Sequence, residues 1–250
     1  MQRFDSLDAV APPQPSVCTI GAFDGVHLGH QQLIRSMVQG ARARQAQATV
    51  VTFFPHPRVV LGRAPDRYLT LPDEKAEQIA ALGVDVLVVH PFTPQTVLIS
   101  AEQFLDTLRS RFQLLGLWVG ADFALGHQRK GDVGWLCEQG ARLGFEVHVV
   151  PHLSMGNMRI SSTRIRDALA RGDIRDANLC LGRPFHIRGY YNGDQKVCAD
   201  PRQWLPAPGT YAALVEGRTL EVSLSSDAPC TITLEHPLPG GARVITLTFV

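Results

Sequence analysis

Between residues 17 and 151 the sequence alternates short, apolar, β-branched runs with longer segments of helical periodicity, and this alternation constrains the fold more than any other feature. Strands and helices in alternation are typical of an open parallel sheet built from βα units. Each run is short and apolar enough to be buried on both faces of such a sheet. The expected strands are residues 17–22, 49–54, 84–89, 117–120 and 145–150.

The segment after the first expected strand has the pattern of a packing helix. Its apolar side chains recur at helical spacing and form one stripe. They are Leu33, Ile34, Met37, Val38 and Ala41. The sequence therefore predicts a helix that covers one face of the sheet.

Start signals mark three further helices. Ser100 and Gln103 have the spacing of a capping box. Ser161 or Ser162 can cap a helix that continues to residue 170, and Asp173 can cap the next one.

The pattern changes after the last of these helices. From residue 185 onward, Pro and Gly separate short stretches with strand character, at residues 211–215, 220–224, 230–234 and 243–249. We therefore expect an α/β domain over residues 1–184 and a small β domain over residues 185–250.

Composition and charge limit the class of protein. The chain has 24 Lys and Arg residues against 23 Asp and Glu, which gives no general attraction for nucleic acid or a membrane surface. No apolar run approaches the ~20 residues of a membrane span, and the first residues do not resemble a secretory signal. The five cysteines contain no CxxC pair, which favours reduced structural thiols. We expect a cytoplasmic protein, and the sequence leaves its oligomeric state open.

The segment GAFDGVHLGH at residues 21–30 follows the first strand and opens the first helix. Ligands of open α/β sheets lie beyond the carboxyl ends of the strands, where a helix N-terminus presents N–H groups to phosphate. His27 and His30 are spaced so that their imidazoles can point the same way, and Gly29 lets a phosphate approach the backbone. Paired imidazole donors would stabilise charge on the α-phosphate and on departing pyrophosphate. The alternative is that both histidines are surface or capping residues.

A second segment, RISSTRIR at residues 159–166, combines hydroxyls at an expected helix cap with three cations. Hydroxyls, helix N-terminal amides and guanidinium groups can together hold the β- and γ-phosphates of a nucleotide. The alternative is a simple N-cap followed by a solvated face of arginines.

Four motifs in this order resemble the adenylyltransferase module of prokaryotic FAD synthetases, over about residues 15–188. They are GAFDGVHLGH, TFFPHP at residues 52–57, VGADFALGHQRKGD at residues 119–132 and RISSTRIRDAL at residues 159–169. The resemblance implies a Rossmann-like fold of the HxGH nucleotidylyltransferase type. It also implies transfer of AMP from ATP to FMN, with FAD and pyrophosphate as products and Mg²⁺ neutralising the phosphates. An FMN phosphate is already ionised near neutral pH, so no general base is needed, and we assign no protein metal ligands.

The resemblance also implies roles for individual residues. The catalytic residues would be His27, His30, Asp122, Ser162, Thr163 and Arg164. Further contacts to ATP would come from Gly21, Phe23, Asp24, Gly29, Arg159 and Ser161. The residues beside the flavin or its phosphate would be Phe54, His56 and Pro57. From the residues alone, TFFPHP can also be a core strand that ends in a turn, and Asp122 can serve as a cap or loop hydrogen-bonding residue.

The chain departs from the family pattern in two places. Family members usually have Asn where this chain has Ala22, so we expect one polar contact or backbone restraint near the nucleotide to be missing and the activity to be weaker. Bifunctional members continue into a riboflavin kinase barrel with a Pro-Thr-Ala-Asn motif, whereas residues 189–201 here are GYYNGDQKVCADP. Glu221 lies in a segment that resembles the strand with the kinase carboxylate, but it can equally be a solvated strand residue. We predict a degenerate barrel without kinase activity.

Three alternatives stay open at this point. One is nucleotidyl transfer to another phosphorylated acceptor. A second is a bifunctional riboflavin kinase/FAD synthetase with an unusual barrel. The third is a catalytically decayed protein that keeps affinity for a flavin or a nucleotide.

Overall fold

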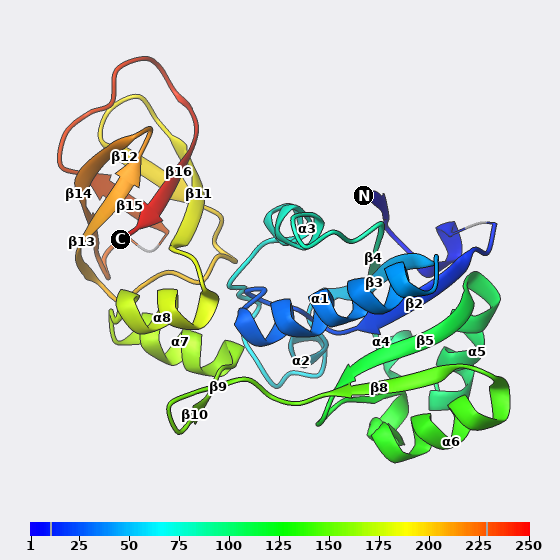
Figure 1. Ribbon diagram of the computed structural model, residues 1–250. Helices are drawn as coiled ribbons and strands as arrows, with labels where there is room; N and C mark the ends of the chain where they lie inside the picture. Colours follow the sequence, from blue (N-terminus) through cyan, green and yellow to red (C-terminus); the bar gives the residue numbers. More distant parts are fainter. Residues whose placement is uncertain (11, 229) are drawn as a thin grey trace. The chain divides into compact units, whose positions relative to one another are not determined.

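The computed structural model describes residues 1–10, 12–228 and 230–250 (Figure 1). These described residues form two compact units, one of residues 1–66 and 72–153 and the other of residues 67–71 and 154–250.

The first unit contains a parallel sheet whose strand order is β1-β4-β3-β2-β5-β8 in the described residues. Its strands are β1 (Gln2–Phe4), β2 (Pro15–Ile20), β3 (Gln47–Phe54), β4 (Val86–Pro91), β5 (Gln113–Gly120) and β8 (Glu146–Val150). The five predicted strands are confirmed, with ends that differ by a few residues. Strand β1 was not predicted, because three residues are too short to show a pattern. The chain runs outward from β2 through β3 to β4 and then returns to β5 on the other side of β2, which creates a switch point between β2 and β5.

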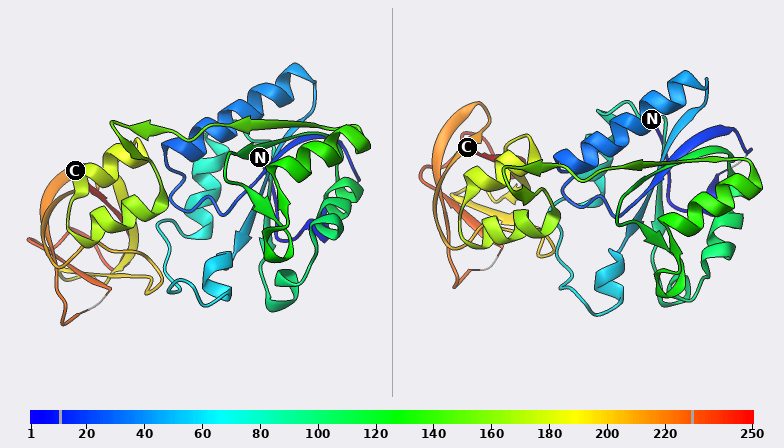
Figure 2. Two further views of the ribbon diagram at one scale, coloured as in Figure 1. Left: turned by 90° about the horizontal axis from the view of Figure 1, so that it is seen from below. Right: turned by 60° about the horizontal axis from the view of Figure 1, so that its bottom comes forward.

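Helices cover both faces of this sheet. The covering helices are α1 (Leu28–Ala43) and α3 (Pro72–Ala80) on one face and α5 (Ala101–Arg111) and α6 (Val133–Leu143) on the other. The loops also contain the short helices α2 (Pro57–Val60) and α4 (Pro94–Val97) and the 3₁₀ turns η1 (Leu7–Ala9) and η2 (His127–Arg129). A small hairpin joins β6 (Ala124–Leu125) to β7 (Gly131–Asp132). In Figure 2 the blue helix α1 and the green helices α5 and α6 lie on opposite faces of the sheet.

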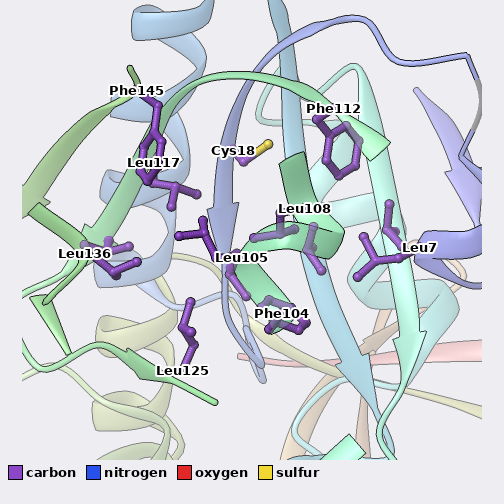
Figure 3. Packing of buried hydrophobic residues seen from close by; sticks show 14 of the residues in the cluster. Leu7, Cys18, Phe104, Leu105, Leu108, Phe112, Leu117, Leu125, Leu136 and Phe145 are labelled. Atoms are coloured by element: carbon purple, nitrogen blue, oxygen red, sulfur yellow. The ribbon is translucent and has the colours of Figure 1, made fainter. Parts of the chain in front are cut away.

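Each face of the sheet has its own apolar core. On the side of α5 and α6, Leu105 and Leu108 pack near Leu117 of β5 and Leu136 of α6 (Figure 3). On the other side the predicted stripe of α1 is confirmed: Leu33, Ile34, Met37 and Ala41 are buried, and Val38 packs against them. The predicted capping box at the start of α5 is also present.

The second unit starts with a hairpin of β9 (Ser154–Met155) and β10 (Met158–Arg159), followed by helices α7 (Ser162–Ala170) and α8 (Ile174–Leu181). Ser161 and Asp173 cap these helices as predicted. A closed antiparallel barrel follows, with the strand order β11-β12-β15-β14-β13-β16. Its strands are β11 (Phe185–Tyr191), β12 (Lys196–Ala199), β13 (Gly209–Val215), β14 (Arg218–Leu224), β15 (Thr231–Leu234) and β16 (Arg243–Phe249).

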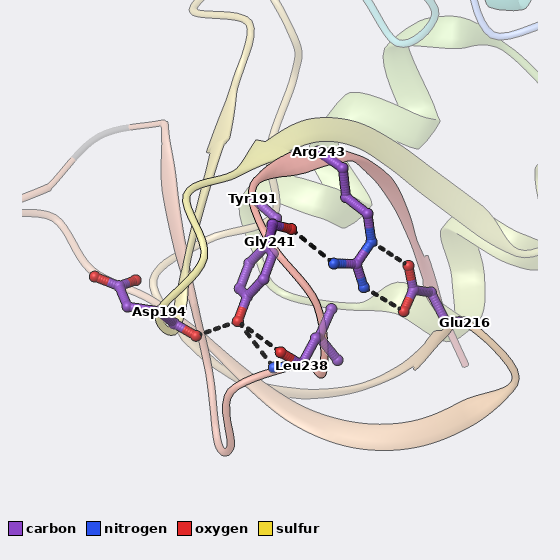
Figure 4. Close-up of polar contacts among 6 residues, drawn as sticks. All are labelled: Tyr191, Asp194, Glu216, Leu238, Gly241 and Arg243. Carbon is purple, nitrogen blue, oxygen red and sulfur yellow. Dashed lines mark hydrogen bonds and ion pairs between the residues drawn. The ribbon is translucent and has the colours of Figure 1, made fainter.

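Side chains fill and close the barrel. Alternate residues of its strands, such as Val197, Val222 and Leu247, are fully buried. At one end the hydroxyl of buried Tyr191 is hydrogen-bonded to the backbone of Asp194 and of Leu238 (Figure 4).

Helix α8 is tied to the barrel through Asn178. The side-chain oxygen of Asn178 accepts the N–H of Phe185 at 2.6 Å, and its side-chain NH₂ donates to the carbonyl of Phe249 at 3.0 Å. Residues 154–184 therefore group with the barrel by contact. The predicted division between residues 184 and 185 stays a prediction: the secondary structure changes there from α8 to β11, but contacts group residues 154–184 with the barrel.

Candidate active site

The loop of residues 21–27 joins the end of β2 to the start of α1 and has a constrained backbone. Phe23, Gly25 and Val26 have φ angles of +48°, +83° and +39°. Non-glycine residues in the left-handed region are strained and persist only where their surroundings hold them. Phe23 and Val26 are 2% and 1% exposed, so packing of their side chains supplies this restraint.

The predicted histidine pair is assembled at the end of this loop. The rings of His27 and His30 stack with centroids 3.6 Å apart and planes inclined by 17°. The ring of Phe23 meets the His30 ring edge-on at 5.2 Å. His27 is the N-cap of α1, and its Nδ1 accepts the N–H of His30 at 3.3 Å. Because Nδ1 is the acceptor, the ring proton of neutral His27 lies on Nε2, which is then a hydrogen-bond donor. Capping and a donor role are compatible in one side chain.

Two glycines leave room for these rings. A Cβ atom at Gly21 would lie 2.9 Å from Cζ of Phe23, and one at Gly29 would lie 3.3 Å from the ring of His27. We predicted Gly29 to allow close approach of a phosphate. Its neighbours show that it also accommodates the folded-back imidazole of His27.

Asp24 is 2% exposed and forms part of the interior. Burial lowers the pKa of the nearby Lys75 ammonium, and the charge of Asp24 opposes this shift. Asp24 thus supplies the negative charge in this buried region of the loop.

A cleft of about 570 Å³ lies beyond the carboxyl ends of β2, β3, β4 and β5. Its apolar wall includes the aromatic side chains Phe53, Phe92, Phe104 and Phe123. Its polar lining includes His56, Arg58, Arg63, Asp122, His127 and Arg129. Ile20, Gly21 and Ala22 also line the cleft, so it adjoins the loop that leads to the histidine pair. This is the position in which open α/β sheets bind ligands.

Two of the residues predicted beside the flavin, His56 and Pro57, line the cleft. The third, Phe54, does not line it, and the neighbouring Phe53 of β3 does. Adjacent residues of a strand point to opposite faces, so only one of the two can face the cleft. The ring of Phe53 meets that of Phe92 at 5.4 Å, nearly edge-on. His56 also caps α2, with its Nδ1 accepting the N–H of Arg58 at 3.0 Å.

Asp122 lines the cleft after β5, and its side chain is 61% exposed. Its Oδ1 lies 3.6 Å from Nε2 of His152, and its backbone carbonyl accepts a hydrogen bond from Arg129 at 2.7 Å. The sequence patterns indicate no role for His152, which lies 30 residues further along the chain. No local pattern could have indicated this pair.

The Ser-Thr-Arg segment belongs to the second unit. Ser161 accepts the N–H of Arg164 at 3.2 Å, so the N-cap interpretation of this serine is confirmed. Ser162 and Thr163 form the first turn of α7, and Arg159 is an exposed residue of β10.

The guanidinium of Arg164 is held by protein groups. It donates to both carboxylate oxygens of Asp176, at 3.1 and 2.5 Å, and to the carbonyl of Met158 at 3.3 Å. Its side chain is 14% exposed. This arrangement ties α7 to α8 and to the β9–β10 hairpin. The neighbouring Arg166 lies over the ring of Trp204, at 5.8 Å from its centroid.

Comparison with known proteins adds to this geometry. A family model described as FAD synthetase matches residues 10–164, a range that includes the histidine pair, the cleft and the start of α7. The chain belongs to the FAD synthetase family.

Curated relatives agree with this assignment. The bifunctional riboflavin kinase/FMN adenylyltransferase of Listeria monocytogenes is 38% identical over 72% of this chain. The matched region spans only 58% of the length of that relative. The protein of the same name from Escherichia coli is 34% identical over 94% of this chain and 74% of its own length. A protein named FAD synthetase from Listeria monocytogenes is 32% identical over 84% of this chain and 88% of its own length.

A solved structure shares the fold. The crystal structure of a protein named macrolide-efflux protein from Streptococcus pneumoniae has a TM-score of 0.83, covering 99% of this chain and 88% of its own. At 23% identity this likeness shows the architecture alone. No helix in the described parts of this family member is long and apolar enough to cross a membrane. The described residues likewise contain no group of three or more His, Cys, Asp or Glu residues placed to hold a metal ion.

Proposed function

We propose that this chain transfers AMP from ATP to FMN, releasing FAD and pyrophosphate, in the cytoplasm. The observation that carries the proposal is the stacked pair of His27 and His30 at the N-terminus of α1, beside a cleft with an aromatic wall. Imidazole and backbone N–H donors at a helix N-terminus suit the charge that develops on phosphate oxygens during nucleotidyl transfer.

The cleft of the first unit is the proposed FMN site. Phe53 and Phe92 offer ring edges and faces to a flat aromatic ligand. Arg58, Arg63 and Arg129 contribute cations that suit a phosphate group. These features favour a phosphorylated flavin over an acceptor without an aromatic ring.

For ATP we assign the histidine pair to the phosphates, and we retain Arg159, Ser162 and Thr163 as predicted phosphate contacts. Arg164 is better assigned to holding the β9–β10 hairpin, because Asp176 and Met158 accept from its guanidinium. Mg²⁺ would enter with ATP and neutralise the phosphates, held by phosphate oxygens and water.

We further propose that the barrel has no riboflavin kinase activity. Buried side chains such as Val222 and Leu247 occupy its interior, and Glu221 is exposed on the outer face of β14. Residues 189–201 contain no Pro-Thr-Ala-Asn motif and no threonine.

The test is product analysis after incubation with Mg²⁺ and ATP labelled in either the α- or the γ-phosphate, with FMN or riboflavin as acceptor. We expect FAD that contains the α-label from FMN, and no labelled FMN from riboflavin. Transfer of the γ-label to riboflavin would show a working kinase. An absence of labelled product with FMN would contradict the proposed adenylyl transfer.

A further inference from the structure

The carbonyl group of Ala22 is held from two elements of the first unit. Nζ of Lys75, on α3, donates to it at 2.9 Å, and Oγ1 of Thr52, on β3, donates at 3.1 Å. These donors lie 53 and 30 positions along the chain from Ala22. The start of the histidine loop is therefore fixed to both the sheet and a covering helix.

Lys75 is an unusual interior residue. It is 4% exposed, although lysine is among the side chains that proteins bury least. A buried ammonium is tolerated where hydrogen bonds and an opposite charge compensate for lost solvation. Here the Ala22 carbonyl supplies the acceptor, and the carboxylate of buried Asp24 supplies the charge. Both partners belong to the loop that ends at His27.

Packing of Phe23 and Val26 restrains this loop, and the hydrogen bonds to the Ala22 carbonyl add to that restraint. Phe23 and Val26 occupy left-handed backbone conformations that strain a residue with a Cβ atom. Phe23 directly follows Ala22, and its ring contacts the ring of His30. A shift of the Ala22 peptide would thus be transmitted to Phe23 and to the histidine pair.

We propose that Lys75 and Thr52 are positioning residues, which fix the Ala22 carbonyl and thereby hold His27 and His30 in their stacked arrangement. The restraint acts on the backbone, so it does not depend on the side chain at position 22. The catalytic consequence rests on the proposed adenylyl transfer, whereas the geometric consequence does not.

The sharpest variant is Thr52→Val, which removes the hydroxyl and keeps the shape of the side chain. Thr49→Val is the matched control, because Thr49 is a buried residue of the same strand that pairs with Cys18 and Val86 rather than with the loop. We expect kcat for FAD formation to fall about tenfold in Thr52→Val, since small misplacement of catalytic groups has large effects on rate. KM for ATP should change less than kcat. Thr52→Ser should restore the rate, and Thr49→Val should leave it unchanged.

The lysine is tested with Lys75→Met. Because this change leaves the carboxylate of Asp24 buried without its counter-charge, the double variant Asp24→Asn, Lys75→Met is measured beside it and beside Asp24→Asn alone. In the single variant Lys75→Met, measured on folded protein, we expect kcat to fall at least as much as in Thr52→Val. The double variant should be slower than Asp24→Asn alone.

A second measurement does not depend on activity. Nitrogen NMR of the imidazole rings distinguishes an Nδ1 that accepts a hydrogen bond from one that carries the proton. In the wild type we expect His27 as the Nε2–H tautomer, and in Thr52→Val and Lys75→Met a mixed population.

The two readouts separate the proposals. Unchanged kcat together with an unchanged His27 tautomer in folded Thr52 and Lys75 variants would overturn the positioning role. If the wild type forms no FAD, the proposed function fails and the tautomer decides the positioning role: a shift in the variants supports it, and no shift rejects it.

Discussion

His27 accepts the backbone N–H of His30 on Nδ1 at 3.3 Å, while the two imidazole rings stack with centroids 3.6 Å apart. One side chain therefore caps α1 and, through Nε2–H, presents a donor at the same helix end.

Changing His27 or His30 to Ala should lower turnover about 100-fold, the effect of losing one charge-stabilising donor. His27→Asn should keep the cap of α1, because Asn is a preferred N-cap residue, and still lose the rate. Steady-state kinetics and thermal unfolding measure both effects. His236→Ala is the control, since its side chain is 70% exposed on the second unit. Full turnover in both alanine variants would contradict the assigned roles.

Arg164→Met should destabilise the second unit by about 1.5–3 kcal/mol, the usual contribution of hydrogen bonds to charged groups. The reason is that Asp176 and the carbonyl of Met158 lose their shared donor. Denaturant unfolding measures the change, with Arg175→Met as control on the exposed side of α8. Equal stability of the two variants would remove the structural role of Arg164.

The Asp85 carboxylate should make stability depend on acid. Hydrogen bonds from the Arg42 guanidinium and from the N–H of Ala48 hold the pKa of Asp85 below its ordinary value of 3.8. Because the folded pKa is the lower one, the stabilisation is present above the unfolded value and is lost as pH falls through the folded value.

The corresponding measurement is the free energy of unfolding of the wild type and of Asp85→Asn across pH. Their difference should be largest near neutral pH and should shrink below about pH 4. A difference independent of pH would show that this carboxylate does not stabilise the fold through its charge.

The cysteines should differ in reactivity. Burial raises the pKa of the Cys18 thiol, and Cys18 is fully inaccessible to solvent. Because the thiolate is the reactive form, Cys18 should react with a thiol reagent only after unfolding, whereas exposed Cys137 and Cys198 react in the folded protein. Peptide mapping after brief alkylation identifies the modified residues. Labelling of Cys18 at the rate of Cys137 would contradict its burial.

Strands, helix caps and the histidine motif could be predicted because their signals lie within a few residues of each other. The stripe of α1, the capping box at Ser100 and the cap at Ser161 depend on local spacing, and the structure confirms all three. The order of the motifs was sufficient to indicate the family. The exact ends of the strands were not predictable, because pairing with neighbouring strands determines them.

Tertiary structure decided the contacts between residues distant in the chain. Whether Phe53 or Phe54 faces the cleft follows from the face that β3 presents. The guanidinium of Arg164 is a group that suits a phosphate, yet in the folded chain it forms an ion pair with the carboxylate of Asp176. The sequence by itself indicated five strands of the sheet, the helix caps and the histidine pair, because periodicity and cap spacing are local signals. Only folding brought Lys75 to the Ala22 carbonyl, because a buried charge acquires its partners from whichever elements pack around it.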